Sequence, residues 1–170
     1  MDPFCHVEVV SGSPALFSFN TIQDLVQGKT LSYTSMIRVT YFKPPKRWWF
    51  CVRSMSDIFD GPSFLANQIV VVDVEDFYFN TIGNSVAAYS DAHWWNVSGY
   101  RRLHNNNDVF LAQGEVFSKN SFPGKQTLYF VVRFKIQADA NYTDLQLTDK
   151  LAGYYASQAV FFMKTNYFDE

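Results

Sequence analysis

Charged residues are scarce in this chain: Asp, Glu, Lys and Arg make up 18% of its 170 residues, against about a quarter in an average protein. The formal net charge is only −2, and the chain opens MDPFCHVEVV, without a basic arm. Nucleic-acid binding depends on clustered Lys and Arg that neutralise phosphates. Packaging of RNA or DNA is therefore possible but not favoured.

Long apolar runs are also missing. No segment approaches the roughly 20 apolar residues that span a bilayer as a helix. Met1 is followed by Asp2 and Pro3, whereas a signal peptide has a basic region and then an apolar run. We therefore expect no membrane association, and a cytoplasmic location if the protein is not part of a virion.

Residues that carry metal or nucleophilic chemistry are few. The two cysteines, Cys5 and Cys51, are too few for a disulfide framework or a metal site. Both lie in strand-like runs, so we expect buried thiols, with a disulfide between them as the alternative. Only His6, His93 and His104 could act as a catalytic base, and no GxSxG motif is present. We expect neither an enzyme nor a cofactor.

Aromatic residues, by contrast, reach 18% of the chain, with 17 Phe and 10 Tyr. Large aromatics combined with few charges favour a surface that is partly covered, by copies of the chain or by another protein. The alternative is an aromatic-rich core in a monomer.

The segment from Gln126 to Gln137, QTLYFVVRFKIQ, has the most regular pattern in the sequence. Apolar residues occupy every second position, and polar residues or Tyr fill most of the others. Successive side chains of a strand point to opposite faces, so this pattern predicts a long strand with one buried face. Such a strand needs neighbours of similar length and a second layer over its apolar face.

Further strand-like runs cover residues 4–10, 33–42, 47–54, 68–75, 109–117 and 159–165. A short helix, IQDLVQ, is predicted between a cap at Asn20 or Thr21 and a stop at Gly28. About eight strands with one or two short helices predict an all-β fold: a two-sheet antiparallel β-sandwich, jelly-roll-like, forming a single domain over residues 1–170.

Four local features of this fold can be stated in advance. Residues 33–42 and 47–54 are expected to pair as antiparallel neighbours, and Gly114 is a possible bulge. Residues 81–107 have no clear periodicity and are expected to form a long crossover loop. Both faces of residues 159–165 are apolar, so we expect this strand to be covered on both sides, by another layer or by another subunit.

Two acidic residues, Asp73 and Glu75, share one face of a predicted strand. Two carboxylates at a sheet edge could hold a hard cation such as Ca²⁺. Solvent exposure or pairing with arginine is the favoured interpretation, so they are only weak metal candidates.

Two segments combine tryptophan with positive charge, and in each tryptophan doublet one indole should point inward. Such side chains suit packing, subunit contacts or the stacking of a ligand. The binding or interface candidates are Lys46, Arg47, Trp49, Trp94, Trp95, Tyr100, Arg101 and Arg102.

The low charge, the long aromatic strands and the Asn105–Asn107 run resemble those of small viral coat or protrusion domains. The leading hypothesis is a non-enzymatic structural protein that self-assembles, as a capsid or capsid-protrusion subunit within a virion, with copies of itself or other coat subunits as partners. The alternative is a β-sandwich that binds a carbohydrate or host receptor through the aromatic loop 81–107.

Overall fold

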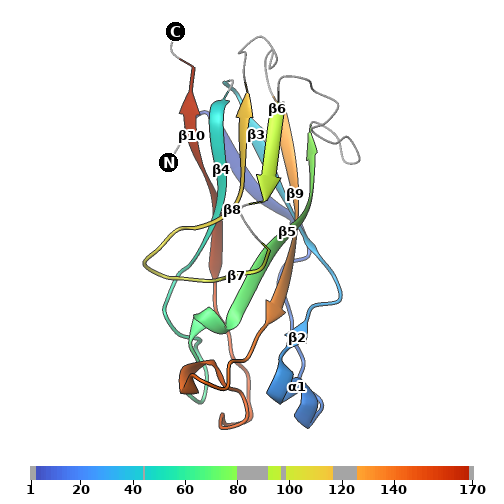
Figure 1. Cartoon of the computed structure of the whole chain (residues 1–170), viewed down its shortest axis with the longest axis vertical. Helices are drawn as coiled ribbons and strands as arrows, with labels where there is room; N and C mark the ends of the chain where they lie inside the picture. Colours follow the sequence, from blue (N-terminus) through green and yellow to red (C-terminus); the bar gives the residue numbers. More distant parts are fainter. Residues whose placement is uncertain (1–2, 44, 80–91, 97–98, 117–125, 169–170) are drawn as a thin grey trace.

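The computed structural model describes residues 3–43, 45–79, 92–96, 99–116 and 126–168, with the backbone alone for 92–96 and 116. In this part the chain forms two sheets and little helix (Figure 1). Sheet A contains β1 (Cys5–Ser11), β2 (Lys29–Thr30), β3 (Ser35–Tyr41), β5 (Val70–Phe79), β7 (Arg101–Arg102) and β9 (Gln126–Ile136). Sheet B contains β4 (Pro45–Ser54), β6 (Ala92–Asn96), β8 (Val109–Val116) and β10 (Ala159–Tyr167).

The strands are arranged in two antiparallel sheets. Sheet A runs β1-β3-β9-β5-β7, with β2 also paired to β9, and sheet B runs β10-β4-β8-β6. From β3 to β10, successive strands alternate between the two sheets, so the chain crosses the sandwich at each connection. The predicted all-β fold of two antiparallel sheets packed as a sandwich is confirmed.

Strand β9 lies inside sheet A, as its pattern predicts. Its residues alternate between buried and half-buried along the whole strand from Gln126 to Ile136. It pairs with β3 on one side and β5 on the other, and Phe130 stands opposite both Ile37 and Phe77. The long alternating strand therefore sets the register of its neighbours, because a one-residue slip would turn its apolar face outward.

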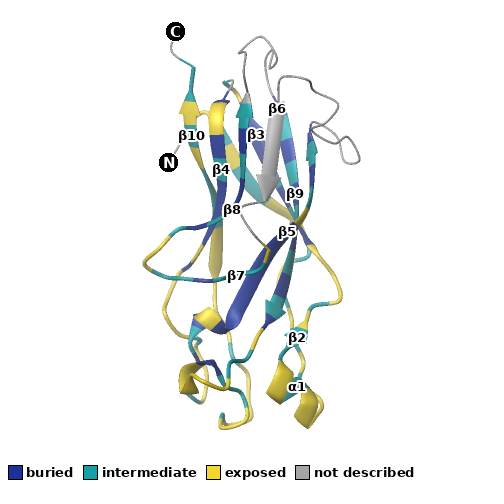
Figure 2. Ribbon diagram, in the orientation of Figure 1, coloured by how far each residue is buried: buried dark blue, intermediate teal, exposed yellow. Residues whose placement is uncertain are grey.

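The core lies between the two sheets (Figure 2). The ring of Phe130 in β9 stacks on Phe50 in β4, with centroids 4.0 Å apart and ring planes 5° apart. Trp48 stacks on Phe77 at 5.6 Å and meets Phe130 edge-on at 5.4 Å. Aromatic pairs of this kind add stability beyond the burial of their area.

The expected pairing of residues 33–42 with residues 47–54 is wrong. Strand β3 pairs with β1 and β9, whereas β4 pairs with β10 and β8 in the other sheet. Each of the two strands has one apolar face, and placing these faces against each other across the sandwich buries both. Turn signals in a sequence do not distinguish this crossing from a hairpin.

The expectation of an irregular loop over residues 81–107 is also wrong in part, because β6 and β7 lie within it. These strands are too short to produce an alternation that could be recognised. Gly114 is not a bulge, since it pairs regularly with Trp48. The register shift of β8 falls instead where Ala112 and Phe110 face β4.

Strand β10 lies at the edge of sheet B, and none of its nine residues is buried. Phe161 and Met163 pack against the core, but Val160 remains 44% exposed. The expectation that a further layer of this chain covers the second face is wrong for the described residues. Cover by another subunit remains a prediction.

The predicted helix forms as α1 (Ile22–Gln27), and one-turn 3₁₀ helices occur at η1 (Asn67–Ile69) and η4 (Thr143–Leu145). The Thr21 hydroxyl caps α1 by accepting a hydrogen bond of 3.0 Å from the Asp24 amide. Gly28 ends the helix with φ +83°, and a Cβ there would overlap the carbonyl of Ile136. Only glycine fits this stop.

Gly114→Ala is expected to destabilise the fold, because the added Cβ would overlap the buried indole of Trp48. Overpacking of this kind typically lowers the free energy of unfolding by about 1–3 kcal/mol, measurable by urea denaturation. Gly99→Ala is the matched control, since a Cβ there meets no atom within 4 Å. Equal stability of the two variants would contradict this packing.

Candidate functional site

The tryptophan doublet of β4 is divided between the core and the surface. Trp48 is 3% exposed and packs against aromatic rings of sheet A. Trp49 is half-buried on the outer face of sheet B. The expectation that one indole of this doublet points inward is confirmed, so Trp49 is the interface candidate at this position.

The second doublet aligns with the first through β8. Gly114 pairs with both Trp48 and Trp94, and Gln113 pairs with both Trp49 and Trp95. Two doublets far apart in the sequence therefore occupy the same two cross-strand rows of sheet B. The side chains of His93, Trp94 and Trp95 lie outside the described part, as do residues 81–91 and 97–98 of the candidate loop 81–107.

The cations on the outer face of sheet B are paired with acids. Arg47 forms an ion pair with Glu115. The Lys164 ammonium lies 2.6 Å from one carboxylate oxygen of Asp108, and Arg53 lies 3.8 Å from the other. Lys46 is exposed. Because three of these four cations face carboxylates, the face offers phosphate little net attraction.

Two of these cations also lie over aromatic rings, whose residues pair with Cys51 from either side. Lys164 is 5.5 Å from the ring centroid of Phe110, and Arg53 is 6.0 Å from that of Phe162. Between these rings in the register lies Cys51, which is fully buried. Burial raises the pKa of the Cys51 thiol to about 12. The two cysteines carry thiols, and no disulfide joins them.

The candidates Tyr100, Arg101 and Arg102 belong to sheet A instead. The ring of Tyr100 lies 5.1 Å from the Arg133 guanidinium and 5.8 Å from the Lys135 ammonium. Arg102 donates hydrogen bonds to the carbonyl oxygens of Gln68 at 2.8 Å and Gln137 at 3.2 Å. Arg102 thus holds the ends of neighbouring segments, and Arg101 is half-exposed in β7.

The two acidic candidates differ in their surroundings. Asp73 is 5% exposed, and its Oδ2 accepts hydrogen bonds from Arg133 Nη2 at 2.9 Å and Nε at 3.2 Å. This contact raises the pKa of Arg133. Glu75 is exposed at the irregularity of β5. Within the described residues, no group of three His, Cys, Asp or Glu side chains could hold a metal ion.

The binding and interface candidates therefore lie on two different sheets. Trp49, Arg47 and the backbone of β6 belong to sheet B, whereas Tyr100 and β7 belong to sheet A. The chain changes sheet between Asn96 and Arg101, so candidates that are close in sequence are not one site. In the described part, no helix is long and apolar enough to cross a membrane.

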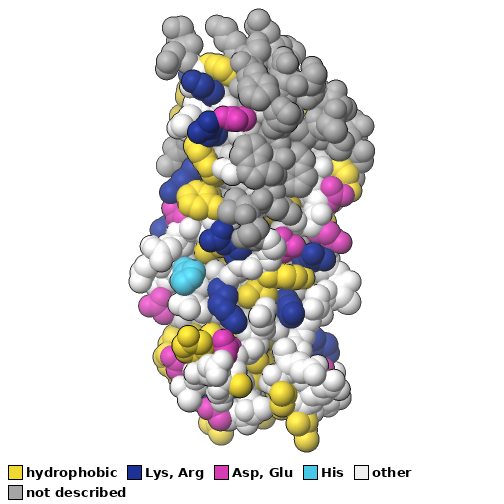
Figure 3. Space-filling view, in the orientation of Figure 1, with side chains coloured by type: hydrophobic (Ala, Val, Ile, Leu, Met, Phe, Trp, Pro, Cys, Tyr) yellow, Lys and Arg dark blue, Asp and Glu magenta, His cyan; other side chains and the backbone are white. Residues whose placement is uncertain are grey.

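Sequence reasoning missed an apolar surface at one end of the molecule. We call this the loop end and define it as α1 together with residues 55–66 and 142–156, which lie away from the end of β10 (Figure 1). Figures 2 and 3 show exposed and hydrophobic residues there. Its large exposed side chains are Ile22 (80%), Val26 (57%), Met55 (59%), Ile58 (40%), Phe64 (53%), Tyr142 (61%), Leu151 (64%) and Tyr154 (77%).

The two loops of this end are joined by backbone hydrogen bonds. Asp60 and Ala156 exchange amide-to-carbonyl bonds of 2.8 and 2.9 Å. The Leu151 amide donates to the Ser63 hydroxyl at 2.8 Å, and a Cβ at Gly61 would overlap the ring of Tyr155. The two loops that carry most of the exposed apolar side chains are therefore held to each other. The sequence feature that could have revealed this surface is the group of large apolar residues in segments without strand periodicity.

Comparison with known proteins gives no relative from which a function could be transferred. No protein-family model matches the chain, and no curated protein sequence matches it. Functional inference therefore depends on the fold and on these surfaces.

Cys51 is expected to resist alkylation in the folded protein. At pH 8, a thiol with a pKa of about 12 is a thiolate in roughly one molecule in ten thousand, and the thiolate is the reactive form. In a Cys5→Ser variant, iodoacetamide labelling followed by mass spectrometry should be slow in buffer and fast in urea. Fast labelling in buffer would contradict the burial of Cys51.

Proposed function

We propose that the chain is a non-enzymatic structural protein that assembles with copies of itself, as a viral capsid or capsid-protrusion subunit. The observation that carries this proposal is the loop end, where Ile22 and Tyr154 are 80% and 77% exposed. Groups of exposed apolar side chains on a β-sandwich mark surfaces that other proteins cover. Their removal from water supplies the association energy.

The charge distribution favours a second copy as the occupant. Arg38, Arg47 and Arg133 are paired with acids within the same chain, and the net charge is only −2. Copies of such a chain repel one another weakly, and no strong field selects a partner of opposite charge. Many viral capsid domains are two-sheet antiparallel β-sandwiches, which supports this choice by analogy of architecture.

A second surface for assembly is the edge strand β10. Edge strands present unpaired backbone groups, and proteins usually protect them with charges, prolines or bulges. In β10, Lys164 is the only charged residue, no proline is present and Val160 is 44% exposed. Two contact surfaces in different places allow growth beyond a dimer, because a single self-complementary patch closes after two copies.

Two of the three histidines, His6 and His104, lie in the part of the chain whose side chains are described. Neither His6 nor His104 hydrogen-bonds a serine, threonine or cysteine side chain in the part of the chain that the structure covers. A nucleophile–histidine pair within hydrogen-bond reach is the usual arrangement for covalent hydrolysis.

Light scattering across protein concentration should show a mass that rises above that of the 19.6 kDa monomer, with closed or extended particles in electron micrographs. The double variant Leu151→Glu/Tyr154→Glu should remain monomeric. Each buried interface anchor typically contributes about 2 kcal/mol, a factor of roughly thirty in Kd. Val10→Glu, at a strand residue that is 45% exposed, is the control and should assemble normally.

A wild-type protein that stays monomeric at every concentration would overturn self-assembly. A double variant that assembles like wild type would show that the loop end is not the interface. Ammonium sulfate should strengthen the association, since burial of apolar surface is favoured by excluded salts.

A further inference from the structure

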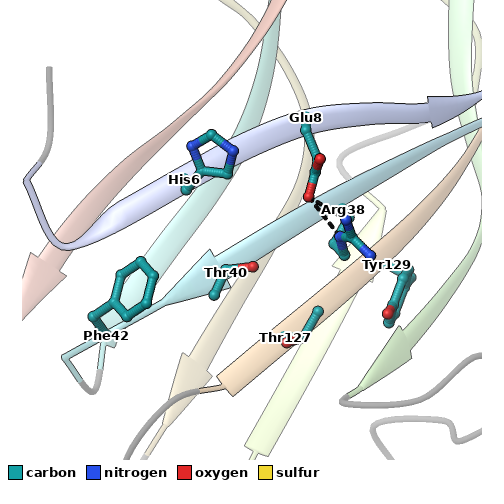
Figure 4. A pocket seen from close by; sticks show the side chains of 7 residues that line it. All are labelled: His6, Glu8, Arg38, Thr40, Phe42, Thr127 and Tyr129. Atoms are coloured by element: carbon teal, nitrogen blue, oxygen red, sulfur yellow. Dashed lines mark hydrogen bonds and ion pairs between the residues drawn. The ribbon is translucent and has the colours of Figure 1, made fainter.

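A groove lies on the outer face of sheet A, across β1, β3 and β9 (Figure 4). Two cross-strand rows of side chains form its floor. One row is His6, Thr40 and Thr127, the other is Glu8, Arg38 and Tyr129, and Phe42 lies at one end. Its volume of about 320 Å³ is at the lower end of the range for ligand pockets, roughly 300–1,000 Å³.

The row of Glu8, Arg38 and Tyr129 is held in place by its own contacts. Arg38 binds Oε1 of Glu8 through Nε at 2.6 Å and Nη2 at 2.5 Å (Figure 4). The hydrogen bond to Glu8, and then one to the Tyr129 hydroxyl, raises the pKa of Arg38. Both Arg38 contacts use the same carboxylate oxygen, which leaves Oε2 of Glu8 to accept from a ligand.

The other row contains a hydroxyl without a protein partner. Thr40 lines the groove and makes no side-chain hydrogen bond within the described residues. A bound polar group can therefore use this hydroxyl as donor or acceptor without breaking a hydrogen bond of the protein. His6, beside it on β1, is exposed and supplies a further ring nitrogen.

Phe42 supplies an apolar surface next to these polar groups. Its side chain is 57% exposed, and its backbone amide donates to the Phe4 carbonyl at 2.9 Å. A ring held at the end of a polar groove suits a ligand that has both an apolar face and hydroxyl groups. The C–H face of a pyranose ring packs on an aromatic ring, while its hydroxyls reach carboxylate, guanidinium and hydroxyl groups.

The charges in the groove narrow the ligand class. The positive charge of Arg38 is offset by Glu8, so a phosphate or carboxylate would gain little attraction and would meet a carboxylate. A wholly apolar ligand would cover Thr40 without giving it a hydrogen bond. A neutral polyhydroxylated molecule can satisfy both donors and acceptors.

We propose that this groove binds a neutral saccharide, through stacking on Phe42 and hydrogen bonds to Glu8, Arg38 and Thr40. The site differs from the 81–107 loop that the sequence indicated, and it goes beyond the proposed assembly. It lies on the outer face of a sheet, whereas the loop end lies at one end of the sandwich. A subunit could therefore bind a glycan while it is assembled.

The experiment uses a glycan array that carries neutral and sialylated oligosaccharides, followed by saturation-transfer NMR with the methyl glycosides of the sugars that bind. Wild-type protein should bind at least one neutral glycan with a Kd of about 1 mM or tighter. Phe42→Ala should weaken binding roughly tenfold, and Thr40→Val roughly three- to tenfold. Thermal unfolding checks that both variants are folded.

Phe64→Ala is the matched control, because this phenylalanine is 53% exposed at the loop end and its loss should leave glycan binding unchanged. Absence of any neutral ligand for folded wild-type protein would overturn the proposal. So would binding of sialylated glycans alone, or an equal loss of binding in Phe42→Ala and Phe64→Ala. The mass by light scattering should be unchanged in the groove variants, which separates this test from that of assembly.

Discussion

The contact on which the rest of the structure depends is the stack of Phe130 on Phe50, with ring centroids 4.0 Å apart. It joins β9, inside sheet A, to β4 in sheet B. Phe77 packs on Phe130 and stacks on Trp48, so the same aromatic cluster includes both of these residues. Once Phe130 faces inward, the strand pleat places Tyr129 and Arg133 outward. The candidate surfaces on both sheets are therefore consequences of how the core is packed.

The surfaces of the molecule differ in how far their side chains are already engaged. On sheet B, Lys164 lies over Phe110 and binds Asp108, so charge and aromatic surface are largely used within the chain. On sheet A, the groove retains the hydroxyl of Thr40 and one carboxylate oxygen of Glu8. The loop end retains apolar area. The engaged side chains of sheet B suit structural support, the unengaged polar groups of the groove suit ligand binding, and the apolar area of the loop end suits association.

Much of the local structure could be predicted. The alternation of β9, the Thr21 cap and the Gly28 stop of α1 all follow from the residues themselves, because each depends on neighbours in the sequence. The division of Trp48 from Trp49 was predictable for the same reason. The pairing of β3 with β9 rather than with β4 was not, because many partners can cover one apolar face.

By itself, the sequence determined where the longer strands of this protein lie, which face of β9 is apolar and that its aromatic residues must be covered. Local backbone preference and side-chain alternation are sufficient for that. Only the tertiary structure decided that Tyr100 and Trp95 belong to different sheets, that His6 lies beside Thr40, and that the apolar residues of α1 stay in solvent. These arrangements depend on contacts between residues far apart in the chain, and the alternation pattern of one strand does not specify which strand pairs with it.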